Sequence, residues 1–156
     1  MVRMGELATS ASVGDVLVTI GLGSCIGVAL VDARRPIVGL AHVMLPEATA
    51  TGGPVAKFAD TAVPELARAV RAKGAARLEA VIVGGAQMFS FSGEGGANIG
   101  ARNEAAVREQ LGGLGIPVRA AATGGRKGRT VRVHVDGARV TVREVAGLEE
   151  DLYTRG

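Results

Sequence analysis

Cys25 and His42 are the residues whose chemical types and spacing first suggest a reaction. The chain of 156 residues contains one cysteine and two histidines. Cys25 directly precedes an apolar run at residues 26–31, and His42 lies in a second apolar run at residues 37–43. An imidazole next to a thiol can lower the pKa of the thiol and produce a thiolate nucleophile. The pair therefore predicts a thiol-dependent reaction in which His42 serves as the base.

A hairpin would bring these two residues together. Residues 32–36, with aspartate and proline at their ends, are typical of a turn between two strands. Pairing the strands outward from this turn places Cys25 opposite His42 or Val43, according to which residue closes the hairpin. Directly opposed residues have β-carbons about 4.5–5.5 Å apart. We therefore expect a thiolate–imidazolium pair, in which the pKa of Cys25 lies below the ordinary thiol value of about 8.5.

The sequence before Cys25 favours a sharp turn, because Gly21, Gly23 and Ser24 allow the backbone to bend. At such a turn, the N–H groups of Gly23 and Ser24 can face the oxyanion that forms when a thiolate attacks a carbonyl. Two alternatives remain open. Cys25 can be a packing residue in an apolar run, and His42 can be a half-buried histidine at a strand end.

Three other features match functional patterns less well. The glycine-rich residues 21–27 imitate a dinucleotide-binding turn, but a strand rather than a helix is expected after them. Residues 124–129 lack the spacing of a P-loop and predict either a solvated turn or a docking site for an acidic partner. His134 shares a polar face with Arg132 and Asp136, which is typical of a surface histidine.

The composition limits the class of protein. Apolar residues make up 47% and charged residues 21% of the chain, so we expect one folded domain over residues 1–156. A formal charge of +3 and an aromatic content of 3% do not indicate nucleic-acid binding. The single cysteine excludes an internal disulfide and, with two histidines, a Cys/His cluster for structural zinc. The absence of a spanning apolar segment and of a secretory signal favours a cytoplasmic protein without membrane insertion.

The hydrophobic pattern predicts an α+β fold. Helical spacing predicts one helix over residues 59–73 and a second, capped by Asn98, that ends near Leu111. Strands are expected at residues 15–20, 26–31, 37–43, 78–83, 116–122, 131–135 and 139–145. We expect a mostly antiparallel framework with both helices layered on one side.

Six blocks along the chain form an ordered set of motifs. They are Thr19-Ile20-Gly21-Leu22-Gly23-Ser24-Cys25, Ala41-His42-Val43-Met44-Leu45-Pro46, Lys57-Phe58-Ala59-Asp60, Gly84-Gly85-Ala86-Gln87-Met88-Phe89, Asn98-Ile99-Gly100-Ala101-Arg102-Asn103, and Thr123-Gly124-Gly125 through Gly128-Arg129. Together they resemble the chemoreceptor glutamine deamidase family, CheD, over almost the whole chain. The sequence departs from the family at Phe58, where tyrosine is common, and residues 47–56 and 90–97 follow no family pattern.

The resemblance implies a fold, a reaction and three catalytic residues. The fold is a three-layer α-β-β arrangement, and the family's catalytic cysteine, histidine and threonine fall by motif position on Cys25, His42 and Thr19. The reaction is hydrolysis of selected glutamine side chains on methyl-accepting chemotaxis receptors to glutamate, through a thioester on the cysteine and without a metal or organic cofactor. We expect Thr19 to hydrogen-bond to the imidazole and fix its tautomer.

The resemblance also implies protein partners. Family members bind chemotaxis receptors as substrates and a CheC-type phosphatase. Candidate partner-binding residues are Met88, Phe89, Arg126 and Arg129. Two alternatives remain open: an adaptor that docks on receptors or phosphatase, with Phe91 as a further contact, and a receptor glutamyl methylesterase that uses the same thiol.

Overall fold

The computed structural model of the chain describes residues 1–48, 53–87 and 98–155. These residues form two α-helices, two short 3-10 helices and nine β-strands. The strands are β1 (Leu7–Ser10), β2 (Val16–Leu22), β3 (Ile26–Asp32), β4 (Val38–Val43), β5 (Leu78–Gly84), β6 (Val118–Thr123), β7 (Arg129–His134), β8 (Arg139–Glu144) and β9 (Glu150–Tyr153). The helices are η1 (Val55–Lys57), α1 (Ala59–Ala72), α2 (Ile99–Gly113) and η2 (Asp136–Ala138).

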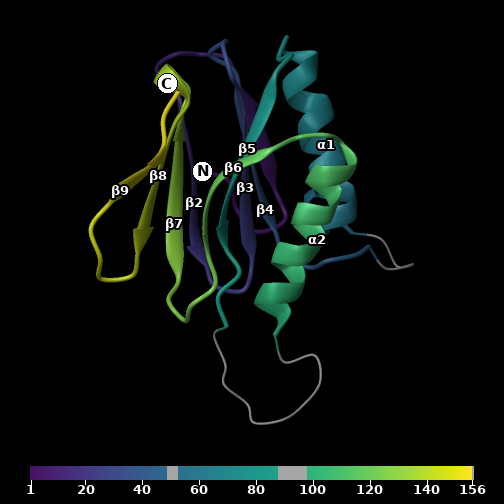
Figure 1. Ribbon diagram of the computed structural model, residues 1–156, viewed down its shortest axis with the longest axis vertical. Helices are drawn as coiled ribbons and strands as arrows, with labels where there is room; N and C mark the ends of the chain where they lie inside the picture. The colour runs from purple at the N-terminus through teal and green to yellow at the C-terminus, as the bar shows by residue number, and fades with distance from the viewer. Residues whose placement is uncertain (49–52, 88–97, 156) are drawn as a thin grey trace.

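The elements form three layers. One sheet has the strand order β1-β4-β3-β5-β6, and the other has the order β2-β7-β8-β9. Helices α1 and α2 lie on the face of the five-stranded sheet that points away from the four-stranded sheet (Figure 1). All strand pairs are antiparallel except β5 with β6. The predicted α+β fold, with three layers and mostly antiparallel strands, is confirmed.

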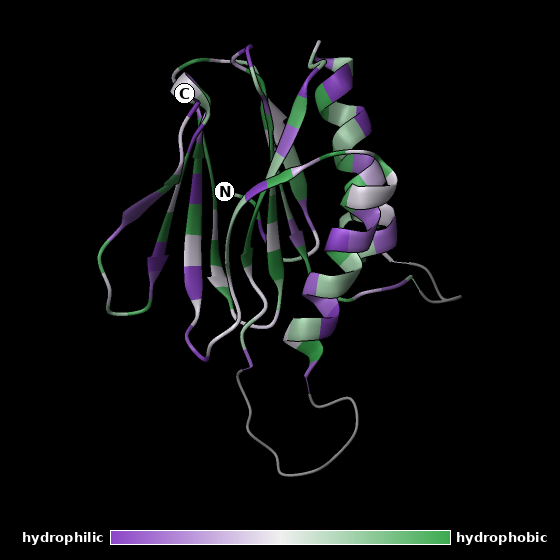
Figure 2. Cartoon of the chain, in the orientation of Figure 1, coloured by the Kyte–Doolittle hydropathy of each residue, from purple (hydrophilic) through white to green (hydrophobic). Residues whose placement is uncertain are grey.

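Strand β3 lies at the centre of the molecule, and all seven of its residues are buried. Successive side chains of a strand point to opposite faces of the sheet. Val28 and Leu30 pack in a cluster with the helices, whereas Ala29 and Val31 pack in a second cluster between the two sheets. The outer sheet has a different pattern: from Thr130 to His134, β7 alternates between polar and apolar residues (Figure 2), and its burial alternates in step. The space between the sheets is therefore apolar and closed to water along most of β3.

The two predicted helices agree with the structure to within two residues at each end, and Asn98 caps α2 by accepting a hydrogen bond from the N–H of Ala101. The sequence analysis missed β1 and β9. Each has only four residues and lies at the edge of its sheet, so neither has a long alternating pattern. Within the described ranges, no helix is long and apolar enough to cross a membrane.

Candidate active site

The predicted hairpin forms from β3 and β4, but its register differs from the prediction. Gly27 pairs with His42 and Ile26 with Val43, so Cys25, just before β3, is not directly opposite His42. The turn is longer than expected because the carboxylate of Asp32 accepts hydrogen bonds from two N–H groups within it. The expectation of direct opposition is therefore wrong. Cys25 and His42 are diagonal neighbours, a relation in which strand residues lie about 7–8 Å apart.

Both residues nevertheless face the same space. Cys25 is half-buried and packs against the cluster between the two sheets. His42 is 1% exposed and follows Leu40, a residue of the same cluster, by two positions along β4. Gly27 lies between them. A β-carbon there would lie 3.0 Å from Leu22 Cδ1 and 3.1 Å from a Val131 methyl group, so glycine allows the outer sheet to approach closely at this point.

That close approach brings Thr19 of β2 against His42. Thr19 is 0% exposed, and its Oγ1 lies 2.6 Å from the carbonyl oxygen of Val2 and 2.7 Å from Nδ1 of His42. A hydroxyl has one proton to donate, and the Val2 carbonyl can only accept. Thr19 therefore donates to Val2 and accepts from Nδ1–H of His42. This arrangement fixes the neutral imidazole as the Nδ1–H tautomer and leaves Nε2 with its lone pair.

Nε2 of His42 is the atom available to act as a base. It is buried and has no hydrogen-bond partner among the residues that the structure describes. A buried nitrogen without a partner is costly in a stable interior and calls for an explanation, and a proton-accepting role in a reaction is one such explanation. The predicted contact between Thr19 and the imidazole is present in the structure, and it runs through the hydroxyl.

The pKa values of the two reactive groups shift in directions opposite to those expected for an ion pair. Burial raises the pKa of the Cys25 thiol and lowers the pKa of the His42 imidazole. Burial disfavours the charged form of either group, so the thiol keeps its proton and the imidazole stays neutral. Burial therefore favours a neutral thiol and a neutral imidazole, in contrast to the thiolate–imidazolium pair that the sequence suggested.

The turn that carries Cys25 is held by all three of its carbonyl groups. The Gly23 carbonyl accepts from the N–H of Ala86 at 2.9 Å, and the Cys25 carbonyl accepts from the N–H of Gly85 at 2.9 Å. The Ser24 carbonyl accepts from the side chain of Asn103 at 3.0 Å. These bonds attach the turn to the end of β5 and to α2.

The contact with β5 depends on Gly84. Its φ is +119°, and a β-carbon there would lie 2.1 Å from the carbonyl oxygen of Cys25. Only glycine fits so close to the neighbouring backbone.

The N–H groups of the same turn differ in their partners. The N–H of Gly23 donates to the carbonyl of Gly21 at 3.0 Å, so the expectation that Gly23 supplies an oxyanion donor is not supported. In the described part of the chain, no group accepts a hydrogen bond from the N–H of Ser24 or of Cys25. These two consecutive N–H groups are the candidate oxyanion donors.

Asn103 is a site residue that the sequence analysis did not single out. It is 0% exposed, and its Nδ2 donates to the carbonyl of Ser24 at 3.0 Å and to the carbonyl of Met44 at 2.9 Å. A signal was present in the sequence: Asn103 occupies a buried helical stripe with Val107 and Leu111. A polar side chain in such a stripe requires buried partners.

The predicted partner-binding residues fall into three groups. Met88 and Phe89 lie outside the described residues, as does Phe91. Arg126 is exposed in the turn before β7. Arg129 is 7% exposed, and its guanidinium donates to two backbone carbonyls and pairs with Glu144. The buried side chain of Arg129 therefore anchors the backbone at Gly84 and Gly124, and it is not exposed as a surface contact.

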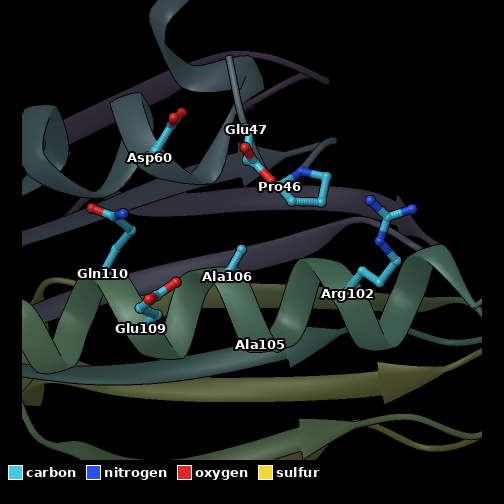
Figure 3. A pocket seen from close by; sticks show the side chains of 8 residues that line it. All are labelled: Pro46, Glu47, Asp60, Arg102, Ala105, Ala106, Glu109 and Gln110. Carbon is cyan, nitrogen blue, oxygen red and sulfur yellow. The ribbon is translucent and has the colours of Figure 1, made fainter. Parts of the chain in front are cut away.

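An open groove runs between α2 and the segment that follows β4, and Figure 3 shows its lining side chains. They are Pro46, Glu47, Asp60, Arg102, Ala105, Ala106, Glu109 and Gln110. Thr19, Cys25 and His42 do not line this groove. Within the described ranges, no group of three acidic, cysteine or histidine side chains is arranged to hold a metal ion.

Comparison with known proteins identifies the family. The family model CheD, chemotactic sensory transduction, matches residues 44–144. The probable chemoreceptor glutamine deamidase CheD of Geobacillus kaustophilus is 47% identical over 139 residues, which cover 85% of this chain and 84% of the relative. The chemoreceptor glutamine deamidase CheD of Thermotoga maritima is 41% identical over 152 residues, 96% of this chain and 94% of the relative. The chain therefore belongs to the CheD family.

Proposed function

We propose that this chain is a protein-glutamine glutaminase that converts glutamine side chains of chemotaxis receptors to glutamate and releases ammonia. The proposal is supported by the family membership and by the names of its relatives, which are chemoreceptor glutamine deamidases. It is also supported by a cysteine and a histidine that face one space between two sheets. We further propose that the protein works in the cytoplasm, where the signalling helices of such receptors lie.

The first half of the reaction forms a thioester. Nε2 of His42 removes the proton from the Cys25 thiol as Sγ attacks the side-chain carbonyl carbon of glutamine. The carbonyl oxygen becomes an oxyanion, which accepts hydrogen bonds from the N–H groups of Ser24 and Cys25. The protonated imidazole then gives its proton to the departing nitrogen. Ammonia leaves, and the glutamyl group remains bound to Cys25 as a thioester.

The second half of the reaction hydrolyses the thioester. His42, neutral again, removes a proton from a water molecule that attacks the same carbonyl carbon. The second oxyanion uses the same two N–H groups. Its collapse breaks the bond between carbon and sulfur, and the imidazole returns the proton to Cys25. Glutamate is released, and one water molecule has been consumed for each ammonia produced.

The observation that carries this proposal is the state of His42. The bond to Thr19 leaves Nε2 as the basic nitrogen, and burial keeps the imidazole neutral. A general base must be unprotonated at the pH of the reaction. Nε2 of His134 also lacks a hydrogen-bond partner among the described residues, so the feature that distinguishes His42 is the bond between its Nδ1 and Thr19, which fixes the tautomer.

The test is deamidation of the purified cytoplasmic fragment of a chemoreceptor from the same cell, followed by ammonia release and peptide mass spectrometry. Cys25→Ala and His42→Ala should each abolish a mass increase at specific glutamines. The second histidine provides a matched control: His134 lies at the end of β7, and His134→Ala should retain wild-type activity. Full activity of Cys25→Ala would overturn the proposal.

The same assay separates the alternative functions. Release of methanol from methylated receptors by wild type, with no release of ammonia, would indicate a glutamyl methylesterase that uses the same thiol. Binding to receptors without either product would indicate an adaptor. Binding of a CheC-type phosphatase is a separate prediction, which is tested by co-purification with Cys25→Ala, because docking does not require the thiol.

A further inference from the structure

We infer that Asn103 is a positioning residue for the proposed deamidation, because it aims the N–H of Cys25 at the oxyanion without touching the substrate. The inference rests on the proposed function and extends it to a residue on α2. Three observations carry it: the two bonds that the side chain donates, the geometry of the peptide that it holds, and the unpaired oxygen that it leaves buried.

The amide of Asn103 uses both of its protons to hold the site. Nδ2 lies 3.0 Å from the carbonyl oxygen of Ser24 and 2.9 Å from that of Met44. Both neighbours are acceptors, so the nitrogen and not the oxygen of the amide must face them. Ser24 immediately precedes the nucleophile, and Met44 follows the strand that carries His42. One side chain thus links the backbone just before Cys25 to the backbone just after the strand of His42.

Peptide geometry connects this contact to catalysis. In a planar trans peptide, the carbonyl oxygen of one residue and the N–H of the next point in opposite directions. The bond from Asn103 to the Ser24 carbonyl therefore fixes the direction of the Cys25 N–H. The preceding peptide is fixed in the same way, because the Gly23 carbonyl accepts from Ala86. Two consecutive N–H groups are thus oriented before any substrate binds, as oxyanion stabilisation requires.

The unpaired atom of Asn103 shows that the side chain is present for its two donated bonds and not for its oxygen. Its Oδ1 is buried and has no hydrogen-bond partner among the described residues. A buried acceptor without a partner destabilises the folded state. Leucine has a similar size and would avoid this cost at a position that shares its stripe with Val107 and Leu111, but it would leave the carbonyl groups of Ser24 and Met44 without this donor. Asn103 therefore leaves one oxygen of its own unpaired and satisfies two buried backbone carbonyl groups.

The first test compares two reactions of Asn103→Leu. Deamidation of the receptor fragment forms an oxyanion, whereas alkylation of Cys25 by iodoacetamide displaces iodide and forms none. We expect kcat to fall by about 10- to 100-fold, within the loss that follows removal of an oxyanion donor, with little change in KM. The rate of alkylation should remain within about twofold of wild type. Val107→Ala is the control: it loosens the same buried face of α2 and should leave kcat unchanged.

The second variant, Asn103→Asp, tests the donated bond by pH. A protonated carboxyl can donate one of the two bonds, and burial beside two carbonyl groups favours the protonated form. The ratio of kcat for Asn103→Asp to that for Asn103→Leu should therefore rise as the pH falls. If Asn103→Leu does not fold, the same pH rise in Asn103→Asp alone, measured against wild type, tests the inference.

Three results would overturn the inference. They are an unchanged kcat in Asn103→Leu, a parallel loss of deamidation and alkylation, and a flat pH ratio. Failure of the proposed function itself would look different, because wild type would then release no ammonia from the receptor fragment.

Discussion

Replacing Thr19 by valine removes the hydroxyl that fixes the tautomer of His42 while keeping the shape of the side chain. Thr19 Oγ1 makes two bonds, one of 2.6 Å to the Val2 carbonyl and one of 2.7 Å to Nδ1 of His42. In Thr19→Val both partners stay buried and lose their hydrogen bond. The variant therefore changes hydrogen bonding and not the volume of the core.

The expected loss of stability follows from the number of unpaired groups. A buried polar group that loses its partner costs about 1–3 kcal/mol, so two such groups should lower the free energy of unfolding by about 2–6 kcal/mol. A domain in the middle or upper part of the usual stability range of about 5–15 kcal/mol stays folded after this loss. Urea unfolding measures the difference directly.

The loss of kcat is separate from the loss of stability, because it arises in protein that remains folded. General acid–base catalysis contributes about 10²- to 10⁴-fold to a rate, and part of that depends on the correct tautomer. We expect kcat of Thr19→Val to fall by about 10- to 100-fold, less than in His42→Ala. Thr19→Ser keeps the hydroxyl and is the matched control; its kcat should stay within about threefold of wild type.

Nitrogen NMR of the His42 ring shows directly which of its two nitrogens carries the proton. Wild type should show a protonated Nδ1 and an unprotonated Nε2 for His42 at neutral pH. In Thr19→Val both tautomers should be populated. A wild-type spectrum with the proton on Nε2 would refute the argument, since Thr19 would then donate to the imidazole and not to Val2.

Two further predictions concern pH. Burial raises the pKa of the Cys25 thiol, so iodoacetamide should alkylate the native protein slowly at pH 7. The rate of alkylation should increase as the pH rises beyond the ordinary thiol pKa of about 8.5. Fast alkylation below neutrality that is lost in His42→Ala would instead indicate a thiolate–imidazolium pair. Asp32 is 1% exposed, and burial alone would raise its pKa, but four backbone N–H groups outweigh burial and lower the pKa. Its contribution to stability is therefore present above the unfolded pKa of about 3.9 and is lost as the pH falls below it. Asp32→Asn should lower the free energy of unfolding, measured in urea at pH 7, by at least about 3 kcal/mol, the value of two charge-assisted hydrogen bonds, and by less at pH 3. An equal loss at both pH values would contradict a lowered pKa of Asp32.

The sequence was sufficient to locate both α-helices and seven of the nine strands, but not the register in which β3 and β4 pair. Apolar runs and glycines located β3 and β4, because periodicity is a local property. The pairing of the two strands depends on how many residues the turn uses. Here Asp32 accepts hydrogen bonds from Arg34 and Arg35 within the turn and from Ala76 and Arg77 beyond α1. The second pair of contacts comes from a distant part of the chain, so local turn preferences could not give the register.

The dependence on long-range contacts also explains why the partners of Thr19 and Arg129 could not be predicted from the sequence. Thr19 has the composition of an ordinary strand residue, and only the family resemblance singled it out. Its contact with His42 depends on the packing of one sheet on the other, which the spacing along either strand does not reveal. Arg129 shows the reverse error: an arginine in a glycine-rich basic loop is typical of a surface contact, yet Glu144 and two carbonyls hold it inside. Long-range contacts decided both cases.

The neutral state of the pair is consistent with the place where it lies. A thiolate–imidazolium pair between two apolar sheets would require both charges to leave water, and burial opposes each of them. The groups that hold His42 in the described structure, the hydroxyl of Thr19 and the backbone, carry no charge to offset this cost. A neutral pair avoids the cost until the substrate carbonyl arrives. Negative charge then develops on the carbonyl oxygen, to which the N–H groups of Ser24 and Cys25 can donate hydrogen bonds, and the proton that left sulfur is already on Nε2. Cleavage of an amide needs that proton on the departing nitrogen, so a resting state that stores it on Cys25 supplies the leaving group without any proton from solvent.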